Sequence, residues 1–223
     1  MEDGNLMINI IYEDNHLLVV EKKPNVLVQA DNTNDIDLLT ILKKYLKEKY
    51  NKPGNVYLGL VHRLDRPVGG VMVFAKTSKA ASRLSEQVRT HQIKKEYQAV
   101  LCGKAKEKDN LQDYLLKDEK TNMVKVNKNG KFAELDYQLI KYCDNLSLVK
   151  INLKTGRSHQ IRVQFSSRHL PLWGDQRYNK NAKVGEQIAL YATGLSFYHP
   201  VTKELLSFKI NTPDEYPWNI FKV

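Results

Sequence analysis

One short polar cluster in the sequence combines residue types that can do chemistry. His62, Arg63 and Asp65 stand between two apolar runs, and the pair Gly69-Gly70 follows them. A polar cluster at the end of a buried strand often builds a site, and adjacent glycines allow the backbone to approach a ligand closely. By itself this pattern supports a structural and a functional interpretation equally.

A second feature is the concentration of positive charge between Lys150 and Lys183. The chain has a net charge of +10, and this segment holds eight Lys or Arg residues against one acid, Asp175, which amounts to +7. The eight are Lys150, Lys154, Arg157, Arg162, Arg168, Arg177, Lys180 and Lys183. Such an excess favours a polyanionic partner, although a solvated lysine face would give the same composition. Several arginines and histidines lie here, and these types often contact phosphates and bases.

Three strings of residues, taken in order, resemble the motifs of RluA-type pseudouridine synthases. His62-Arg63-Leu64-Asp65 with Gly69-Gly70 and Ala75-Lys76-Thr77 is similar to the nucleophile motif of that family. Lys95-Glu96-Tyr97-Gln98-Ala99 is similar to its tyrosine motif, and Gly156-Arg157-Ser158-His159-Gln160-Ile161-Arg162-Val163 to its arginine motif. Gly174-Asp175 through Tyr178, and Leu195-Ser196-Phe197 through His199-Pro200, also match, so the likeness extends roughly from Ile11 to Phe208.

The resemblance implies an RNA-modifying isomerase whose nucleophile is Asp65. Its carboxylate either attacks the sugar or base covalently or removes a proton during glycosidic cleavage, and both routes are open. Burial disfavours the charged form of a carboxylate, and by the same resemblance Arg162 is the cation that keeps Asp65 ionised. A guanidinium forms a bidentate pair that lysine cannot reproduce. The alternative for Arg162 is a phosphate contact on a solvated helix face. Tyr97 is expected against the target uracil, although without the motif it would be interpreted as a core aromatic of a strand.

The remaining expected site residues contact RNA. A uridine in structured RNA must leave its stack to react, and Arg63 resembles the arginine that fills the vacated space; its alternative is a local salt bridge. His159 lies three residues before Arg162, so the two would share a helix face, although a lone histidine is more often structural. The expected RNA-binding residues are Arg63, Arg157, His159, Lys150, Lys154, Lys180 and Lys183.

Some positions depart from the usual pattern of the family. Val68-Gly69-Gly70, Gln164 and Tyr191 stand where other residues are frequent, and these departures concern the substrate rather than the reaction. The amino-terminal S4 RNA-binding module of many relatives is also missing. We therefore expect residues 1–223 to form a single catalytic domain without an S4 domain.

The expected reaction breaks the glycosidic bond of uridine, rotates the base and joins it again through carbon. No group is transferred from outside, so neither a redox cofactor nor a metal is expected. The expected partner is structured ribosomal or transfer RNA, with no membrane, and the protein is expected to be a monomer.

Cys102 and Cys143 lie far apart in the sequence without metal-ligand spacing, and residues 1–5 do not resemble a signal peptide. Both features favour a cytoplasmic protein.

The pattern of apolar residues predicts the elements that position these side chains. Strands are expected at 8–12, 17–21, 56–61, 71–75, 95–101, 132–142, 146–153, 188–198 and 204–210. Helices are expected at 36–50 with Asp35 or Asp37 as the cap, from Ser78 as the cap, and at 158–168. Residues 104–110 are expected to be a charged loop. The fold class is therefore α+β, like that of the pseudouridine synthases, with a large, mostly antiparallel sheet, flanking helices and a central RNA-binding cleft.

Two other functions are compatible with parts of this pattern. An RNA-binding protein of the same fold that has lost catalysis predicts damage at Asp65, Tyr97 or Arg162, and all three residues are intact. A hydrolase could use Asp65 with His62 or His159. The chain, however, has no nucleophile elbow, no metal signature and only one strongly marked carboxylate, whereas a glycosidase needs two.

Overall fold

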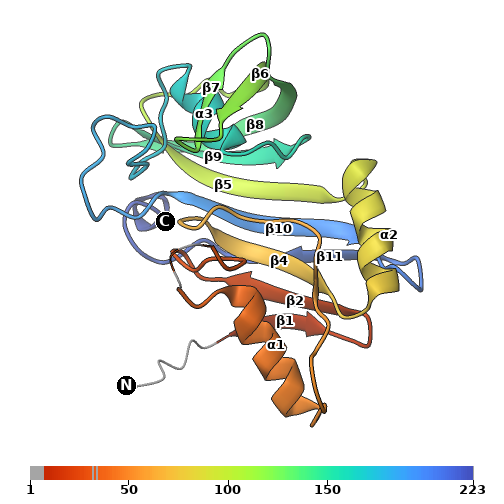
Figure 1. Ribbon diagram of the computed structural model, residues 1–223. Helices are drawn as coiled ribbons and strands as arrows, with labels where there is room; N and C mark the ends of the chain where they lie inside the picture. Colours follow the sequence, from red (N-terminus) through yellow and green to blue (C-terminus); the bar gives the residue numbers. More distant parts are fainter. Residues whose placement is uncertain (1–7, 32, 34, 223) are drawn as a thin grey trace. The chain divides into compact units, whose positions relative to one another are not determined.

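The computed structural model describes residues 8–31, 33 and 35–222, so that residues 1–5 lie outside the described part. The chain has the α+β fold that the sequence predicts, with a large, mostly antiparallel sheet and three α-helices (Figure 1). It divides into two compact units. Unit 1 extends to Ile93 and includes Ser196–Phe208, and unit 2 comprises Lys94–Leu195 and the residues from Lys209 onward. The single catalytic domain and the central cleft stay predictions.

Four antiparallel strands form the sheet of unit 1. They are β1 (Asn9–Glu13), β2 (Leu17–Lys22), β3 (Gly59–Leu60) and β4 (Gly69–Ala75), in the order β1-β2-β4, with β3 also pairing with β4. All seven residues of β4 are buried, as expected for a continuous apolar run. The register pairs Lys22 with Gly70, so the last residue of β2 lies beside the start of β4.

Two capped helices accompany this sheet. Helix α1 (Leu38–Lys49) begins after Asp37, whose carboxylate accepts the Thr40 amide at 3.1 Å, and this confirms one of the two predicted caps. Helix α2 (Ser78–Arg89) begins after Thr77, whose hydroxyl accepts the Ala80 amide at 3.1 Å. The prediction of Ser78 as the cap is therefore wrong by one residue, because Thr77 is still extended and already offers a capping oxygen.

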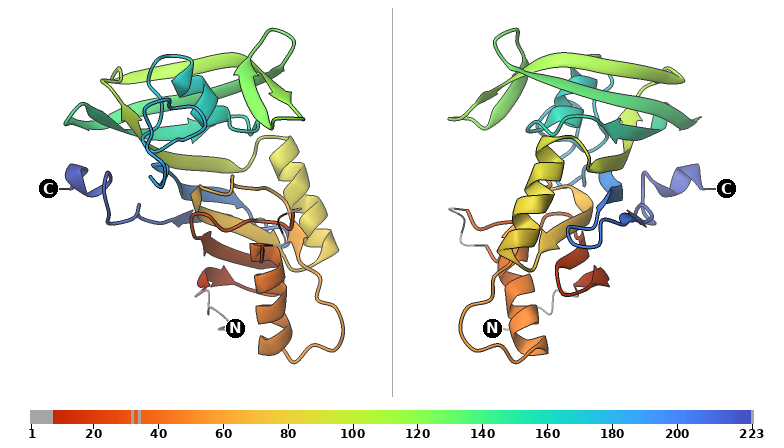
Figure 2. Two further views of the ribbon diagram at one scale, coloured as in Figure 1. Left: turned by 60° about the vertical axis from the view of Figure 1, so that its left-hand side comes forward. Right: turned by 90° about the vertical axis from the view of Figure 1, so that its right-hand side faces the viewer.

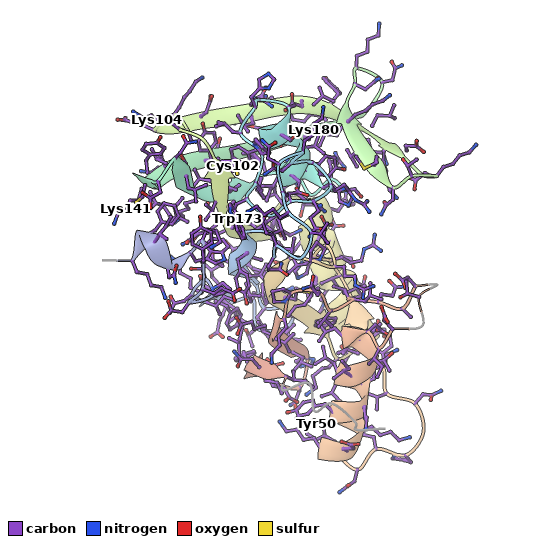
Figure 3. All side chains as sticks on the ribbon, turned by 90° about the vertical axis from the view of Figure 1, so that its left-hand side faces the viewer. Tyr50, Cys102, Lys104, Lys141, Trp173 and Lys180 are labelled. Carbon is purple, nitrogen blue, oxygen red and sulfur yellow. The ribbon has the colours of Figure 1, made fainter. Side chains whose placement is uncertain are left out.

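The carboxylate of Glu13 ties α1 to β1 and to the end of β4. It accepts hydrogen bonds from Tyr45 (2.9 Å), Lys49 (2.8 Å), Lys76 (2.8 Å) and Tyr50 (2.6 Å), the last being the residue that follows α1 in Figure 3. Burial raises the pKa of Glu13, but the two ammonium groups and the two hydroxyls outweigh it and lower that pKa to about 2. Glu13 thus stays ionised at neutral pH.

Five antiparallel strands of unit 2 pair in succession. They are β5 (Lys94–Cys102), β6 (Lys108–Asp118), β7 (Met123–Val126), β8 (Lys131–Cys143) and β9 (Leu146–Leu153), in the order β5-β9-β8-β6-β7. The hairpin β8–β9 confirms the prediction from the sequence. Asp144 and Asn145 form its turn with φ of 51° and 57°, values that asparagine and aspartate tolerate better than most residues.

Helix α3 (Gln160–Ser166) covers one face of this sheet, as Figures 1 and 2 show. Val163 packs with Leu115, Val124 and Ala133, and Phe165 meets the Tyr137 ring edge-on at 5.1 Å. Because successive side chains of a strand point to opposite faces, every second residue of β5, β8 and β9 faces α3. We call this the α3 face, and the opposite side the outer face.

Three further predictions differ from the structure. The run 56–61 forms a strand only at Gly59–Leu60, the two residues that pair with β4. The predicted loop 104–110 ends at Lys108, where β6 begins and pairs with β8, because ladder formation overrides the charged composition. Gly69 and Gly70 belong to β4 instead of preceding it, with Gly70 at φ 131°. The strands β6 and β7 were not predicted at all.

Strands β10 (Leu190–Tyr198) and β11 (Leu205–Lys209) agree with prediction, and a short 3-10 helix (Asn219–Phe221) follows.

Glu13→Gln should destabilise the protein by roughly 2–4 kcal/mol at pH 7, from ~1.4 kcal/mol per pKa unit. Because the folded-state pKa of Glu13 is lowered from 4.5 to about 2, its contribution is complete above the unfolded value and is lost as pH falls toward about 2. Urea unfolding between pH 2 and pH 7 measures this. The wild type and the variant should converge near pH 2, while the exposed control Glu48→Gln should match the wild type throughout. A gap that is independent of pH would contradict the assignment.

Candidate functional site

The segment from His62 to Val68 is an anchored turn in unit 1. The buried His62 accepts the Val73 amide on its Nε2 atom at 3.1 Å, which fixes the start of the segment against β4. The Val68 amide donates to the Asp65 carbonyl at 3.0 Å and closes the turn. Within it the Asp65 side chain is half-buried and Arg63 is exposed. The turn therefore presents a carboxylate and a guanidinium from a fixed backbone.

A buried lysine supports this turn from β2. Lys22 has no exposed surface, and its Nζ atom donates to the carbonyls of Arg66 (2.9 Å) and Lys23 (3.0 Å). Burial lowers the pKa of Lys22 to about 7, the charge of Asp65 opposes that fall, and the charge of Arg66 adds to it. Lys22 is thus a basic group near Asp65 that was not predicted from the sequence. The only signal was a lysine at the end of an apolar strand.

Arg66 holds the far side of the same turn. Its guanidinium donates to Asp35 at 2.6 Å and to the Asn25 carbonyl at 3.3 Å. Both groups are about half exposed, so this ion pair contributes little to stability. Its effect is to tie the turn to the loop that precedes α1.

Arg162 lies in a buried ion pair in unit 2. Its Nε and Nη2 atoms donate to the two carboxylate oxygens of Asp175 at 2.9 and 2.7 Å, and the side chains of the pair are 7% and 0% exposed. Asp175 also accepts the backbone amides of Arg177 and Tyr178. The alternative of a solvated helix face for Arg162 is therefore wrong, because all seven residues of α3 except Ser166 are buried. Its pairing with Asp65 stays a prediction.

Tyr178 joins Arg162 to His159. The Arg162 guanidinium lies over the Tyr178 ring at 5.2 Å, and the tyrosine hydroxyl is 2.7 Å from the Nδ1 atom of His159. The same hydroxyl accepts the Val124 amide at 3.0 Å. His159 precedes α3 in a left-handed conformation with φ 48°, so the prediction that it shares a helix face with Arg162 is wrong. The two residues nevertheless meet on one aromatic ring, and the sequence analysis did not assign a role to that ring.

Tyr97 lies on the α3 face of unit 2. It is 7% exposed and stands opposite Ile151 in the β5–β9 ladder. Ile151 in turn stands opposite Tyr137, whose ring contacts Phe165 of α3. Tyr97 and Arg162 thus belong to the same side of one sheet. The structure brings these two predicted residues to a common face, and their roles stay predictions.

The basic segment does not form one surface. Lys150 pairs with Glu96 and Lys154 with Asp136, each at 2.8 Å, and Lys150 alternates with Val149 and Ile151 onto the outer face. The side chain of Arg157 donates to the Phe132 carbonyl at 2.8 Å. Lys180, labelled in Figure 3, and Lys183 are exposed beyond Asp175. The seven excess charges are therefore distributed over both sides of the sheet.

The described residues contain no group of three or more His, Cys, Asp or Glu side chains that could hold a metal ion. Within the same residues, no helix is long and apolar enough to span a bilayer.

Comparison with known proteins gives a consistent result. The family described as RNA pseudouridylate synthase matches residues 16–167. The ribosomal large subunit pseudouridine synthase D of Buchnera aphidicola subsp. Baizongia pistaciae is 34% identical over 227 residues, which cover 94% of this chain and 70% of that protein. The ribosomal large subunit pseudouridine synthase C of Buchnera aphidicola subsp. Acyrthosiphon pisum is 34% identical over 208 residues, 88% of this chain and 64% of that protein.

A solved structure shares the fold. The human RNA pseudouridylate synthase domain containing 4 matches with a TM-score of 0.77 and 23% identity, covering 92% of this chain and 88% of that one. This likeness concerns the arrangement of the backbone alone.

Asp175→Asn should destabilise the protein by about 3–5 kcal/mol, because it leaves the buried Arg162 charge without its carboxylate. Urea unfolding at pH 7 measures the loss. The matched control is Asp109→Asn, which removes an exposed pair with Lys106 in the same unit and should cost less than about 1 kcal/mol. Equal losses in the two variants would show that the Arg162–Asp175 pair contributes no more than a surface pair.

Proposed function

Because the chain belongs to the RNA pseudouridylate synthase family, we propose that it converts a uridine of large-subunit ribosomal RNA to pseudouridine with Asp65 as the nucleophile. The class of enzyme, an isomerase that acts on uridine in RNA, follows from the family. The observation that carries the assignment of Asp65 is its placement. It is a half-buried carboxylate in a turn anchored by the His62–Val73 and Lys22–Arg66 hydrogen bonds.

The reaction explains why a fixed carboxylate is useful. The bond between N1 of uracil and C1′ of ribose breaks, C5 of the rotated base bonds to C1′, C5 loses a proton and N1 gains one. RNA mass and strand length are unchanged. A carboxylate that adds covalently to the reacting nucleotide divides this rearrangement into two smaller steps. An anchored turn holds the attacking oxygen in place and lowers the entropic cost of reaching the reactive geometry.

Tyr97 and Arg162 complete the proposed catalytic set. Tyr97 supplies a flat ring for the uracil, and its hydroxyl can relay the proton that leaves C5. Arg162 supplies the permanent positive charge that favours an ionised carboxylate. Its bidentate bond to Asp175 and its contact with the Tyr178 ring limit its movement. These contacts support a role that needs a fixed guanidinium rather than a mobile one.

The substrate assignment is supported by the names of the relatives, which act on the large ribosomal subunit. We place the reaction in the cytoplasm and assign it to a monomer. The support for the compartment is the free state of Cys102 and Cys143, which suits a reducing compartment.

Arg63, exposed on the turn that holds Asp65, is the proposed wedge that fills the space left by the extruded uridine.

Asp65→Asn should abolish isomerisation and leave RNA affinity largely unchanged, because the amide keeps the shape but loses the nucleophilic charge. Pseudouridine mapping across total RNA, with and without the wild-type protein, identifies the target. Single-turnover conversion of that target then compares the variants, with the exposed Asp109→Asn as the control. A tenth of wild-type turnover in Asp65→Asn would refute the nucleophile. A mapped site only in transfer RNA would refute the substrate assignment.

Arg63→Ala should slow conversion most when the target uridine is stacked in a folded stem–loop. Extrusion costs a few kcal/mol there, whereas a short unstructured strand has no stack to repair. Asp65→Asn should be equally severe on both RNAs, since it removes the chemistry itself. Single-turnover rates on a matched folded and flexible pair measure the difference. The same loss factor for Arg63→Ala on both RNAs would exclude a wedge.

A further inference from the structure

Lys95 is a half-buried lysine of unit 2. It lies on β5 opposite Leu153 and two residues before Tyr97, so it shares the α3 face with that tyrosine. Among the described residues, no carboxylate or hydrogen-bond acceptor pairs with its ammonium group, and only burial acts on its pKa, which it lowers. Placing a charge in such surroundings costs free energy unless a partner compensates it.

Three other buried or half-buried lysines have partners. Lys22 donates to two carbonyls, Lys76 pairs with Glu13, and Lys150, on the neighbouring strand β9, pairs with Glu96. The contrast between Lys150 and Lys95 is informative, because Lys150 lies on the outer face and Lys95 on the face of Tyr97. Of these two lysines, the one that shares a face with the proposed uracil-binding ring is therefore the one whose ammonium group has no carboxylate partner.

Lys95 is half-buried, and an exposed loop lies beside its ammonium group. A Cβ atom added to Gly156 would stand 3.6 Å from the Lys95 Nζ atom, so the glycine is a close neighbour of the ammonium group. Gly156, Arg157 and Ser158 are exposed. Because Gly156 has no side chain, this neighbour adds no side chain over Lys95.

The loop beside Lys95 is held in place by hydrogen bonds. The buried Gln160 accepts the Thr155 hydroxyl at 2.8 Å and the Arg157 amide at 3.0 Å, and donates to the Glu134 carbonyl at 3.0 Å. These three bonds fix both sides of Gly156. The position of Gly156 beside Lys95 is therefore set by the fold.

We propose that Lys95 binds a phosphodiester group of the RNA next to the nucleotide whose base rests on Tyr97. An ammonium group has three donors and no acceptor, and phosphate oxygens receive most of the hydrogen bonds that proteins make to nucleic acids. Two residues of strand separate Lys95 from Tyr97 by roughly 7 Å, from the ~3.3 Å rise per residue. One nucleotide can therefore reach both residues. This inference rests on the proposed function, since it assumes that the ligand is RNA.

The test compares Lys95→Met with Lys94→Met, its exposed neighbour on the opposite side of β5. The probe is a stem–loop of large-subunit ribosomal RNA with the uridine that the wild type converts. A series of copies carries one neutral methylphosphonate linkage each, at positions around that uridine. The wild type and Lys94→Met should lose on the order of tenfold in affinity at one linkage, the value of a charged hydrogen bond. Lys95→Met should bind the unmodified stem–loop more weakly than the wild type and should lose no further affinity at that linkage. Lys95→Arg should again lose affinity when that linkage is neutralised.

A second measurement separates binding from a structural role. Lys95→Met removes a desolvated charge that has no partner, so its urea midpoint should equal or exceed that of the wild type. A clearly lower midpoint would assign Lys95 to the fold and overturn the proposal. Equal losses for Lys95→Met and wild type at every linkage would overturn it as well. Conversion of the unmodified stem–loop by the wild type is measured in parallel. Conversion without a Lys95-dependent linkage refutes the phosphate site alone, whereas failure to find any uridine of large-subunit ribosomal RNA that the wild type converts refutes the proposed function.

Discussion

The alternation of side chains along β5 and β9 is the constraint on which the chemistry of unit 2 depends. The register that sets Tyr97 opposite Ile151 also sets Lys95 opposite Leu153, and both residues then face α3 with Arg162. A slip of one residue would exchange the two faces. Tyr97 would move to the side of Lys150, and Glu96 would be buried under the helix. Burial of Ala99 and Leu101 of β5, both fully enclosed, opposes such a slip because it would turn them away from the α3 face.

Three basic side chains, Arg162, Lys22 and Lys95, are buried or half-buried, and each has different partners for its positive charge. Arg162 has a carboxylate on two of its nitrogens and an aromatic ring beneath it. Lys22 has two backbone carbonyls and the nearby charge of Asp65. Lys95 has neither. A carboxylate neutralises a guanidinium and holds it still, whereas carbonyl dipoles stabilise an ammonium without cancelling its charge. A buried positive charge without a carboxylate or carbonyl partner lowers the stability of the folded protein. Such a loss of stability is typical of residues that bind a charged ligand.

The local structure that a few adjacent residues can specify was predictable from the sequence. The Asp37 cap, the β8–β9 hairpin with its Asp144-Asn145 turn, and the apolar run of β4 agree with prediction because each depends on neighbours in the chain. The strands β6 and β7 were not predicted. Their exposed charges resemble those of a loop, and they form only because β8 supplies a partner for the ladder. Strand formation in polar sequence depends on pairing more than on the residues themselves.

The sequence by itself determined the family and the class of reaction and indicated the residues proposed for it, because the order and spacing of Asp65, Tyr97 and Arg162 do not depend on how the chain folds. The tertiary structure alone decided how the charges are distributed. Residues that are adjacent in the sequence, such as Lys150 and Ile151, point to opposite faces of a strand, so a basic segment is not a basic surface. Likewise, only folding brings Asp175 and Tyr178 to Arg162, Lys22 to the turn of Asp65, and Gly156 over Lys95. Burial and pairing of a charge are properties of these distant contacts, which no local pattern encodes.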